Sequence, residues 1–216
     1  MPDEGTTRGG MSDAARGDGT ADAQVTVVGH ADLTPDTLRL VESALHRRLE
    51  RLARGPAVVR SGAGSALAFG RAARAAGRRL VVAIPTRDGV PAVPLRPDRL
   101  ATGELLTLAD RVRLLEYDPA DRDACVRADE RMVADGSLLL AVWDGSPSDG
   151  RDATAHLVAF ARARGVPVDV VWPEGAAREP RRASSPSPAR PPRPRARPGS
   201  AVPSCRHVPR GRLDRA

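Results

Sequence analysis

Three polar segments that contain glycine follow short apolar runs, and they carry the residue types that bind phosphate and ribose oxygens. Glycine permits positive φ and a close backbone approach, while Ser and Thr hydroxyls and helix-start amides can bind an anion. Each segment alone is also ordinary loop composition. Together they predict a ligand site lined by Gly29, His30, Ser61, Gly62, Gly64, Ser65, Asp144, Gly145, Gly150, Arg151 and Thr154.

Such a site needs parallel strands whose carboxyl ends meet at one edge of a sheet. Apolar runs predict strands at 24–29, 57–61, 79–85, 138–143 and 167–172. Helical periodicity predicts helices from Pro35, with Thr34 as a favourable cap, and over 66–77, about 120–135 and 153–164. Residues 86–104 read as a Pro/Gly-rich excursion, and 105–117 as a short helix or a strand. Strands that alternate with helices indicate an α/β, three-layer Rossmann-like domain with a mostly parallel sheet over 24–177.

The formal charge of +7 is unevenly placed along the 216 residues. Residues 174–216 hold 11 Arg against 3 acidic residues, whereas residues 1–173 hold 23 basic and 24 acidic residues. We expect 1–23 and 178–216 to be disordered tails, with Met1 or Met11 as the start. The Arg/Pro-rich tail can meet nucleic acid or an acidic partner electrostatically, or act as a charged tether, although it lacks aromatic residues for base stacking. A shifted reading frame of GC-rich DNA would give the same composition.

Several function classes are excluded by composition. All 34 basic residues are Arg, so a lysine Schiff base and a P-loop lysine are ruled out. The two cysteines form no disulfide framework and no His/Cys/acid spacing resembles a metal site, so we expect a reducing cytoplasm, no metal and no cofactor apart from a nucleotide ligand. No apolar run is long enough to span a membrane. A homo-oligomer remains open.

Four phrases carry a resemblance to a known family: VTVVGHADLT, ADGSLLLAVWDG, DATAHLVAFARARG and VPVDVVWPEGAA. Over about 24–177 the chain resembles the SLOG superfamily of Rossmann-like nucleotide-binding domains, most closely its small actinobacterial members. That superfamily includes LOG-type phosphoribohydrolases, which act on nucleoside monophosphates, and the DNA-processing protein A domain. The resemblance implies a nucleotide-type small molecule bound at the strand carboxyl ends.

The chain departs from the LOG pattern where that pattern does chemistry. The LOG-type late loop reads Pro-Gly-Gly-x-Gly-Thr-x-x-Glu, and its Glu supports cleavage of the N-glycosidic bond. If Thr154 is the motif threonine, Leu157 stands at the Glu position, and Asp152 and Ala153 replace glycines. We therefore expect no catalytic residue and a sensor or partner-binding module, with a LOG-like N-glycosidase as the enzymatic alternative. His30 is either a ligand residue or a turn residue that is hydrogen-bonded locally.

Overall fold

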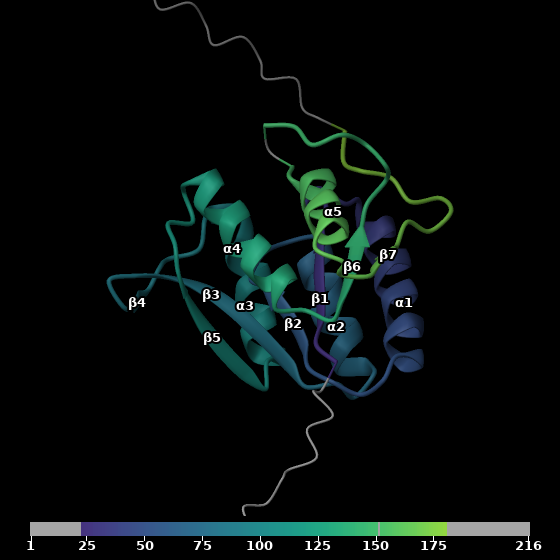
Figure 1. Ribbon diagram of the computed structural model, residues 1–216, viewed down its shortest axis with the longest axis horizontal. Coiled ribbons are helices and arrows are strands. Elements are labelled where there is room, and N and C mark those ends of the chain that lie inside the picture. Colours follow the sequence, from purple (N-terminus) through teal and green to yellow (C-terminus); the bar gives the residue numbers. More distant parts are fainter. Residues whose placement is uncertain (1–22, 151, 181–216) are drawn as a thin grey trace, which may run out of the picture. The chain divides into compact units, whose positions relative to one another are not determined.

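The computed structural model describes residues 23–150 and 152–180, whose strands form one seven-stranded sheet (Figure 1). The strands are β1 Val25–Gly29, β2 Ala57–Arg60, β3 Leu80–Arg87, β4 Val90–Pro91, β5 Arg111–Glu116, β6 Leu138–Val142 and β7 Val168–Val170. Their order is β5-β3-β2-β1-β6-β7, every one of these pairs is parallel, and β4 pairs antiparallel with the end of β3. The predicted α/β class with a mostly parallel sheet is confirmed.

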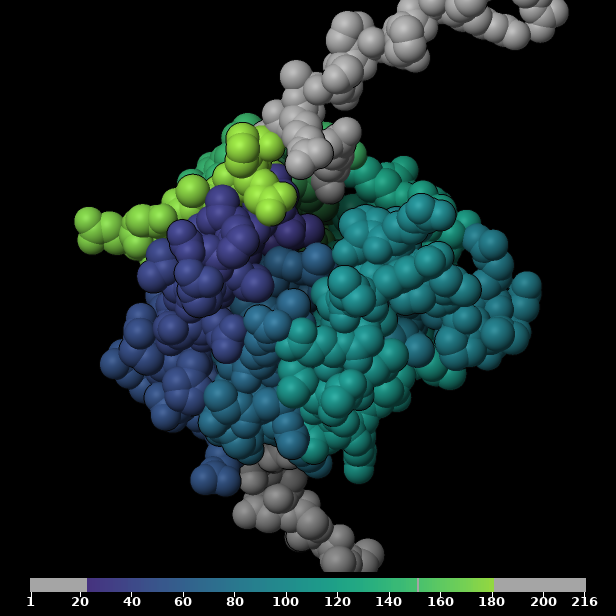
Figure 2. Space-filling model, turned by 180° about the vertical axis from the view of Figure 1, so that it is seen from behind, coloured from purple at the N-terminus to yellow at the C-terminus, as the bar shows by residue number. Residues whose placement is uncertain are grey.

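Helices cover both faces of this sheet. They are α1 Pro35–Arg51, α2 Ser65–Ala75, α3 Arg99–Leu108, α4 Arg122–Ala134 and α5 Thr154–Ala163, with the 3₁₀ turn η1 Arg96–Asp98 before α3. The buried side chains of α1, α2 and α3 share one core with the sheet, and those of α4 and α5 belong to cores on the other face. Figure 2 shows the first face, from purple α1 to teal α3. The three layers are therefore present as predicted.

The central strands are apolar on both faces because helices cover both. Val27 packs into the α1–α3 core while its neighbour Val28 packs into the α4–α5 core. On β6, Leu140 packs into the α1–α3 core and its neighbour Leu139 packs into the α4–α5 core. Continuous apolar runs of this kind are typical of parallel sheets that are buried on both sides.

Residues 86–117 contain more regular structure than the sequence predicted. β3 continues to Arg87, a short hairpin to β4 follows, and α3 and β5 occupy 99–108 and 111–116. The sequence favoured a loop here because of Pro91, Pro94 and Pro97. Pro97, however, lies in the first turn of η1, just before α3, and proline is tolerated at such a position. The segment 105–117 therefore holds the end of a helix and a strand.

The topology places a switch point at β1. The chain leaves β1 to form β2 on one side and returns later to form β6 on the other side. Connections that leave a strand in opposite directions open a crevice at its carboxyl end, where open α/β sheets bind ligands. In the described part of the chain, no helix is long and apolar enough to cross a membrane.

Candidate functional site

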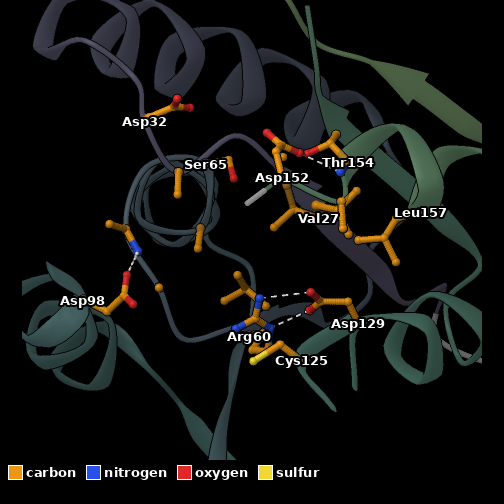
Figure 3. Close-up of a pocket in the computed structure, with 18 of the residues that line it drawn as sticks. Val27, Asp32, Arg60, Ser65, Asp98, Cys125, Asp129, Asp152, Thr154 and Leu157 are labelled. Atoms are coloured by element: carbon orange, nitrogen blue, oxygen red, sulfur yellow. Dashed lines mark hydrogen bonds and ion pairs between the residues drawn. The ribbon is translucent and has the colours of Figure 1, made fainter. Parts of the chain in front are cut away.

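A cavity of about 600 Å³ opens at the carboxyl ends of β1 and β2, between the starts of α2 and α5 (Figure 3). We call it the crevice. Its apolar wall includes Val27, Val28, Val59, Val126 and Leu157. Its polar lining includes Ser61, Ser65, Thr154, three arginines (Arg60, Arg122, Arg178) and five acids (Asp32, Asp98, Asp129, Asp152, Glu179).

The structure brings five of the eleven predicted site residues to the crevice wall: Gly29, Ser61, Gly62, Ser65 and Thr154. His30 and Asp144 are bonded to each other and are not among the lining residues. Gly64 forms the turn into α2, and Gly145 and Gly150 are exposed loop glycines outside the crevice wall. Arg151 lies outside the described residues.

Gly64 shapes the loop that joins β2 to α2. Its φ is +61°, and a Cβ there would lie 2.5 Å from the Ala31 carbonyl oxygen, so both conformation and space require glycine. The Ala63 amide donates to Asp98 Oδ1 at 3.1 Å, and the Ser65 amide donates to the His30 carbonyl at 3.0 Å. The loop is thus held on both sides while its hydroxyl residues face the crevice.

The first turn of α2 keeps free donors beside the crevice. Within the described residues, the amides of Ala66 and Leu67 have no protein acceptor, and Gly64 offers no side-chain cap. Free amides at a helix start, together with the helix dipole, attract an anion. This end of α2 therefore presents two amide donors without a protein acceptor beside the crevice.

Two amides in the first turn of α5 are instead engaged by the protein itself. Asp152 Oδ1 accepts the Thr154 amide at 2.7 Å, and Ser148 Oγ accepts the His156 amide at 2.9 Å. A carboxylate at a helix start also occupies the position that an anion would take. Thr154 lines the crevice, but its amide and the His156 amide are already engaged.

His30 is buried behind the crevice and is held between two carboxylates. Its Nδ1 contacts Asp152, and its Nε2 lies 3.0 Å from Asp144 Oδ1. The Trp172 ring packs against the imidazole edge-on, with centroids 5.6 Å apart. The local-turn interpretation of His30 is wrong, because these side-chain partners lie more than a hundred positions away in the sequence.

Both protonation states of His30 find partners. In the neutral ring, Nδ1–H donates to Asp152 and Nε2 can accept the Asp144 amide at 3.2 Å. In the charged ring, Nε2–H donates to the Asp144 carboxylate. Burial opposes the charge, but the hydrogen bond and negative charge of Asp152 outweigh it and raise the pKa of His30. Burial likewise opposes the charge of Asp152, yet its bonds to His30 and Thr154 prevail and lower the pKa of Asp152.

This pair predicts a pH optimum of stability. The contribution of His30 to the free energy of unfolding is complete below its ordinary pKa of 6.5, and it is lost as pH rises through its raised pKa in the folded protein. The contribution of Asp152 is present above its ordinary pKa of 3.8 and is lost as pH falls through the lowered native value. In urea titrations from about pH 6 to about pH 9, the wild type should lose stability and His30→Gln should lose much less. An equal slope in His30→Gln would refute the assignment, and His156→Gln is the control.

Arg60 and Asp129 form the floor of the crevice (Figure 3). Two parallel bonds of 2.6 and 2.9 Å join the guanidinium to the carboxylate. Burial opposes the charge of Arg60, but the charge of Asp129 prevails and raises its pKa. Burial raises the pKa of the neighbouring Cys125 thiol and raises that of Tyr117 to about 12, so both stay protonated at neutral pH.

Loss of Asp129 is expected to leave a buried, uncompensated arginine. Because the side chains of Arg60 and Asp129 are only 30% and 12% exposed, Asp129→Asn should lower the free energy of unfolding by about 2 kcal/mol. Asp135, at the end of the same helix, pairs with exposed Arg113, and Asp135→Asn should cost less than about 0.5 kcal/mol. Equal effects in urea denaturation would show that the floor pair is not structurally important.

The C-terminal segment of the described chain closes one side of the crevice. Arg178 donates to both Asp32 oxygens at 2.9 Å, and its guanidinium lies 3.5 Å from Asp152. Its backbone forms an antiparallel bridge with Leu33, and the Glu179 amide donates to the Asp32 carbonyl at 2.7 Å. Contacts with the domain thus continue past the predicted boundary at 177.

His30, Asp32 and Asp152 also place three potential metal-ligand atoms within 4.8 Å of one another. Arg178 is bonded to Asp32 and adjoins Asp152, so a protein cation already neutralises these carboxylates. The cluster is therefore explained by its ion pairs.

Sequence reasoning missed the charged lining of the crevice: Asp32, Arg60, Asp98, Arg122, Asp129, Arg178 and Glu179. Only Arg60 carried a signal, because it ends a strand whose other three residues are buried. The remaining charged residues lie on loops, at helix starts or, in the case of Asp129, inside α4, and in the sequence they look like ordinary solvated surface.

No family model matches the sequence, and no curated protein matches it. Among solved structures, the molybdenum cofactor carrier protein from Chlamydomonas reinhardtii is similar at 16% identity, over 69% of this chain and 76% of that one, with a TM-score of 0.46. The molybdenum cofactor binding protein from the phototrophic bacterium Rippkaea orientalis is similar at 14% identity, over 70% of this chain and 77% of that one, with a TM-score of 0.46. DNA processing protein A from Streptococcus pneumoniae gives 18% identity over 70% of this chain, with a TM-score of 0.49, and the chain spans 51% of its length.

The strand order, the switch point and the crevice define the class of this protein. It is a Rossmann-like α/β domain with a cavity at the carboxyl ends of its strands. Sequence identities of 14% to 18% do not show which ligand this chain binds, so the ligand must be inferred from the residues that line the crevice.

Proposed function

We propose that the chain binds a nucleotide or nucleotide-derived ligand in the crevice and does not hydrolyse it efficiently. One observation carries this proposal: a cavity of about 600 Å³ lies at the switch point, beside the open first turn of α2. A cavity of this size suits a small organic ligand, and switch points are where open α/β sheets bind nucleotides. The sequence resemblance to SLOG domains supports the same class.

The lining suggests how the ligand is oriented. An anionic group would meet the Ala66 and Leu67 amides, with the Ser61 and Ser65 hydroxyls beside it. The apolar wall, which includes Val59, offers a surface for a base or sugar. The ligand would then lie across the crevice from α2 towards α5.

The charge of the lining limits the charge of the ligand. Five carboxylates face the crevice against three arginines, and Arg60 and Arg178 are already paired with Asp129 and Asp32. A ligand with several phosphates would meet net repulsion away from α2. We therefore expect a single anionic group to be preferred over a triphosphate.

Weak or absent hydrolysis follows from the absence of a free acid or base at the expected position. Leu157, which the resemblance aligns with the LOG glutamate, lines the crevice with an apolar side chain. The nearby Asp152 is engaged by His30 and the Thr154 amide, and Asp129 is engaged by Arg60. Because its pKa is lowered, Asp152 stays ionised at neutral pH and is a poor proton donor.

A thermal-shift screen of the full chain tests the proposal. The panel would hold adenosine, AMP, cyclic AMP, ADP-ribose, ATP and the guanine counterparts. A ligand at about 100 times its Kd adds about 2.7 kcal/mol, which should raise Tm by about 5–10 °C for a domain of this size. No shift with any compound would refute nucleotide binding. Release of free base from AMP at ordinary enzymatic rates, abolished by Thr154→Ala, would instead establish the N-glycosidase alternative.

A further inference from the structure

A buried hydroxyl in the crevice has no partner among the described residues. Ser65 is only 4% exposed, its amide donates to the His30 carbonyl, and its hydroxyl makes no hydrogen bond within this part of the chain. Its side chain points into the crevice beside the unpaired amides of the first turn of α2 (Figure 3). A buried hydroxyl of this kind is completed by a ligand or by water. Together with the helix start, it marks where the anionic group of a ligand would lie.

Asp98 keeps an available carboxylate oxygen in the same crevice. Three other crevice acids are each held by two protein hydrogen bonds: Asp32, Asp129 and Asp152. Asp98 is half-buried and its Oδ1 accepts the Ala63 amide at 3.1 Å, whereas its Oδ2 has no partner within residues 23–150 and 152–180. Because each carboxylate oxygen has two lone pairs, Asp98 can accept at least two further hydrogen bonds, one at each oxygen.

The Asp98 side chain is directed away from its own helix. Asp98 is the N-cap of α3, where aspartate commonly accepts an amide of the helix that it starts, but it makes no such bond. Its carboxylate lies instead against the loop between β2 and α2 (Figure 3). A Cβ on Gly62 would lie 4.0 Å from Asp98 Oδ1 and 3.9 Å from the Ala66 Cβ. The carboxylate and the first turn of α2 therefore both border Gly62.

We propose that Asp98 accepts hydrogen bonds from the two neighbouring hydroxyls of a ribose, so that the crevice prefers ribonucleotides over their deoxy analogues. This inference rests on the proposed nucleotide binding. In a nucleoside 5′-monophosphate the sugar follows the phosphate directly, so a phosphate at the start of α2 brings the sugar beside Gly62 and Asp98. Hydroxyls donate and an ionised carboxylate only accepts, which gives charge-assisted hydrogen bonds. The uncharged sugar also separates the carboxylate from the phosphate.

Calorimetric titration of the full chain with AMP, 2′-deoxy-AMP and 3′-deoxy-AMP tests this contact, with GMP and its deoxy analogues as a second series. Wild type should bind each deoxy analogue about 10-fold more weakly than the ribonucleotide, because one hydrogen bond to the carboxylate is lost. This comparison requires no variant, so it does not depend on the folding of a mutant.

Two variants assign the preference to a residue. Asp98→Asn keeps an oxygen for the Ala63 amide but places an NH₂ donor at the other position. It should weaken ribonucleotide binding by about 10-fold and reduce the preference over the deoxy analogues to within about threefold. Asp36→Asn removes the same charge from a side chain that is 82% exposed and outside the crevice, and it should leave affinity and preference unchanged.

The outcomes separate this inference from the proposed function. Equal affinity of wild type for ribonucleotides and deoxy analogues would overturn the inference while nucleotide binding stands. A preference that persists unchanged in Asp98→Asn would assign the hydroxyls to another residue, and an equal loss of affinity for every ligand would limit Asp98 to supporting the loop. Either result would overturn it. Binding of neither AMP nor GMP would also overturn it, and no binding across the whole thermal-shift panel would refute the proposed function as well.

Discussion

Gly29→Ala is expected to destabilise the domain by about 3 kcal/mol or more. A Cβ at this position would lie 2.5 Å from the Val142 carbonyl oxygen, 2.6 Å from its Cβ and 3.0 Å from the Ser65 Cβ. Two of these atoms belong to β6, which pairs with β1 in the centre of the sheet. The methyl group can be accommodated only if β1 and β6 separate at the switch point.

Gly62→Ala is the matched control in the next loop. Its Cβ would meet the Ala66 Cβ at 3.9 Å and Asp98 Oδ1 at 4.0 Å, which are ordinary contacts. We expect a change within about 0.5 kcal/mol, measured by urea denaturation of both variants. Equal stability of the two variants would mean that the close approach of β1 and β6 is not maintained in solution.

Gly62→Glu is expected to weaken binding of a nucleotide by about 100-fold without unfolding the protein. The position lines the crevice and has room for a side chain, so the carboxylate would enter the cavity near the first turn of α2. It would take the place of the anionic group and repel it. Gly62→Gln adds the same bulk without charge and separates the two effects.

Gly103→Glu serves as the control for net charge. Gly103 lies in α3 and is exposed, and a Cβ at this position would have no atom within 4 Å. The variant adds one negative charge outside the crevice, so nucleotide affinity should stay within about twofold of the wild type. A similar loss of affinity in both charged variants would point to non-specific electrostatics.

Much of the fold could be predicted because its signals are local. The runs at Val25–Val28 and Leu138–Val142 are apolar on both faces, as a covered parallel strand requires, and Thr34 does cap α1 by accepting the Thr37 amide. The sequence also predicted that Gly29 and Ser61 lie at one edge of the sheet, because the carboxyl ends of parallel strands meet there, and both residues line the crevice. The α3 helix was missed because prolines before it look like loop signals.

The ion pairs of the site could not be predicted because their partners are far apart in sequence. Asp152 is separated from His30 by 122 positions, and Asp129 from Arg60 by 69. No periodicity or local motif relates such residues, and only tertiary packing brings them together.

The sequence predicted Thr154, at the start of α5, as a ligand residue, and the structure changes the role of this helix start. Asp152 faces its own helix, where it accepts the Thr154 amide, and it also holds His30. The amides without a protein acceptor lie instead at the start of α2. Sequence composition cannot tell a helix start that its own side chains satisfy from one that stays open.

Calorimetric titration of the full chain with the compound that gives the largest thermal shift tests the central claim most directly. Wild type and Gly103→Glu should each bind one equivalent with matching affinity, and Gly62→Glu should show about 100-fold weaker binding. Absence of binding to wild type across the whole panel would contradict the claim. So would unchanged affinity in Gly62→Glu, because the ligand would then bind somewhere other than the crevice.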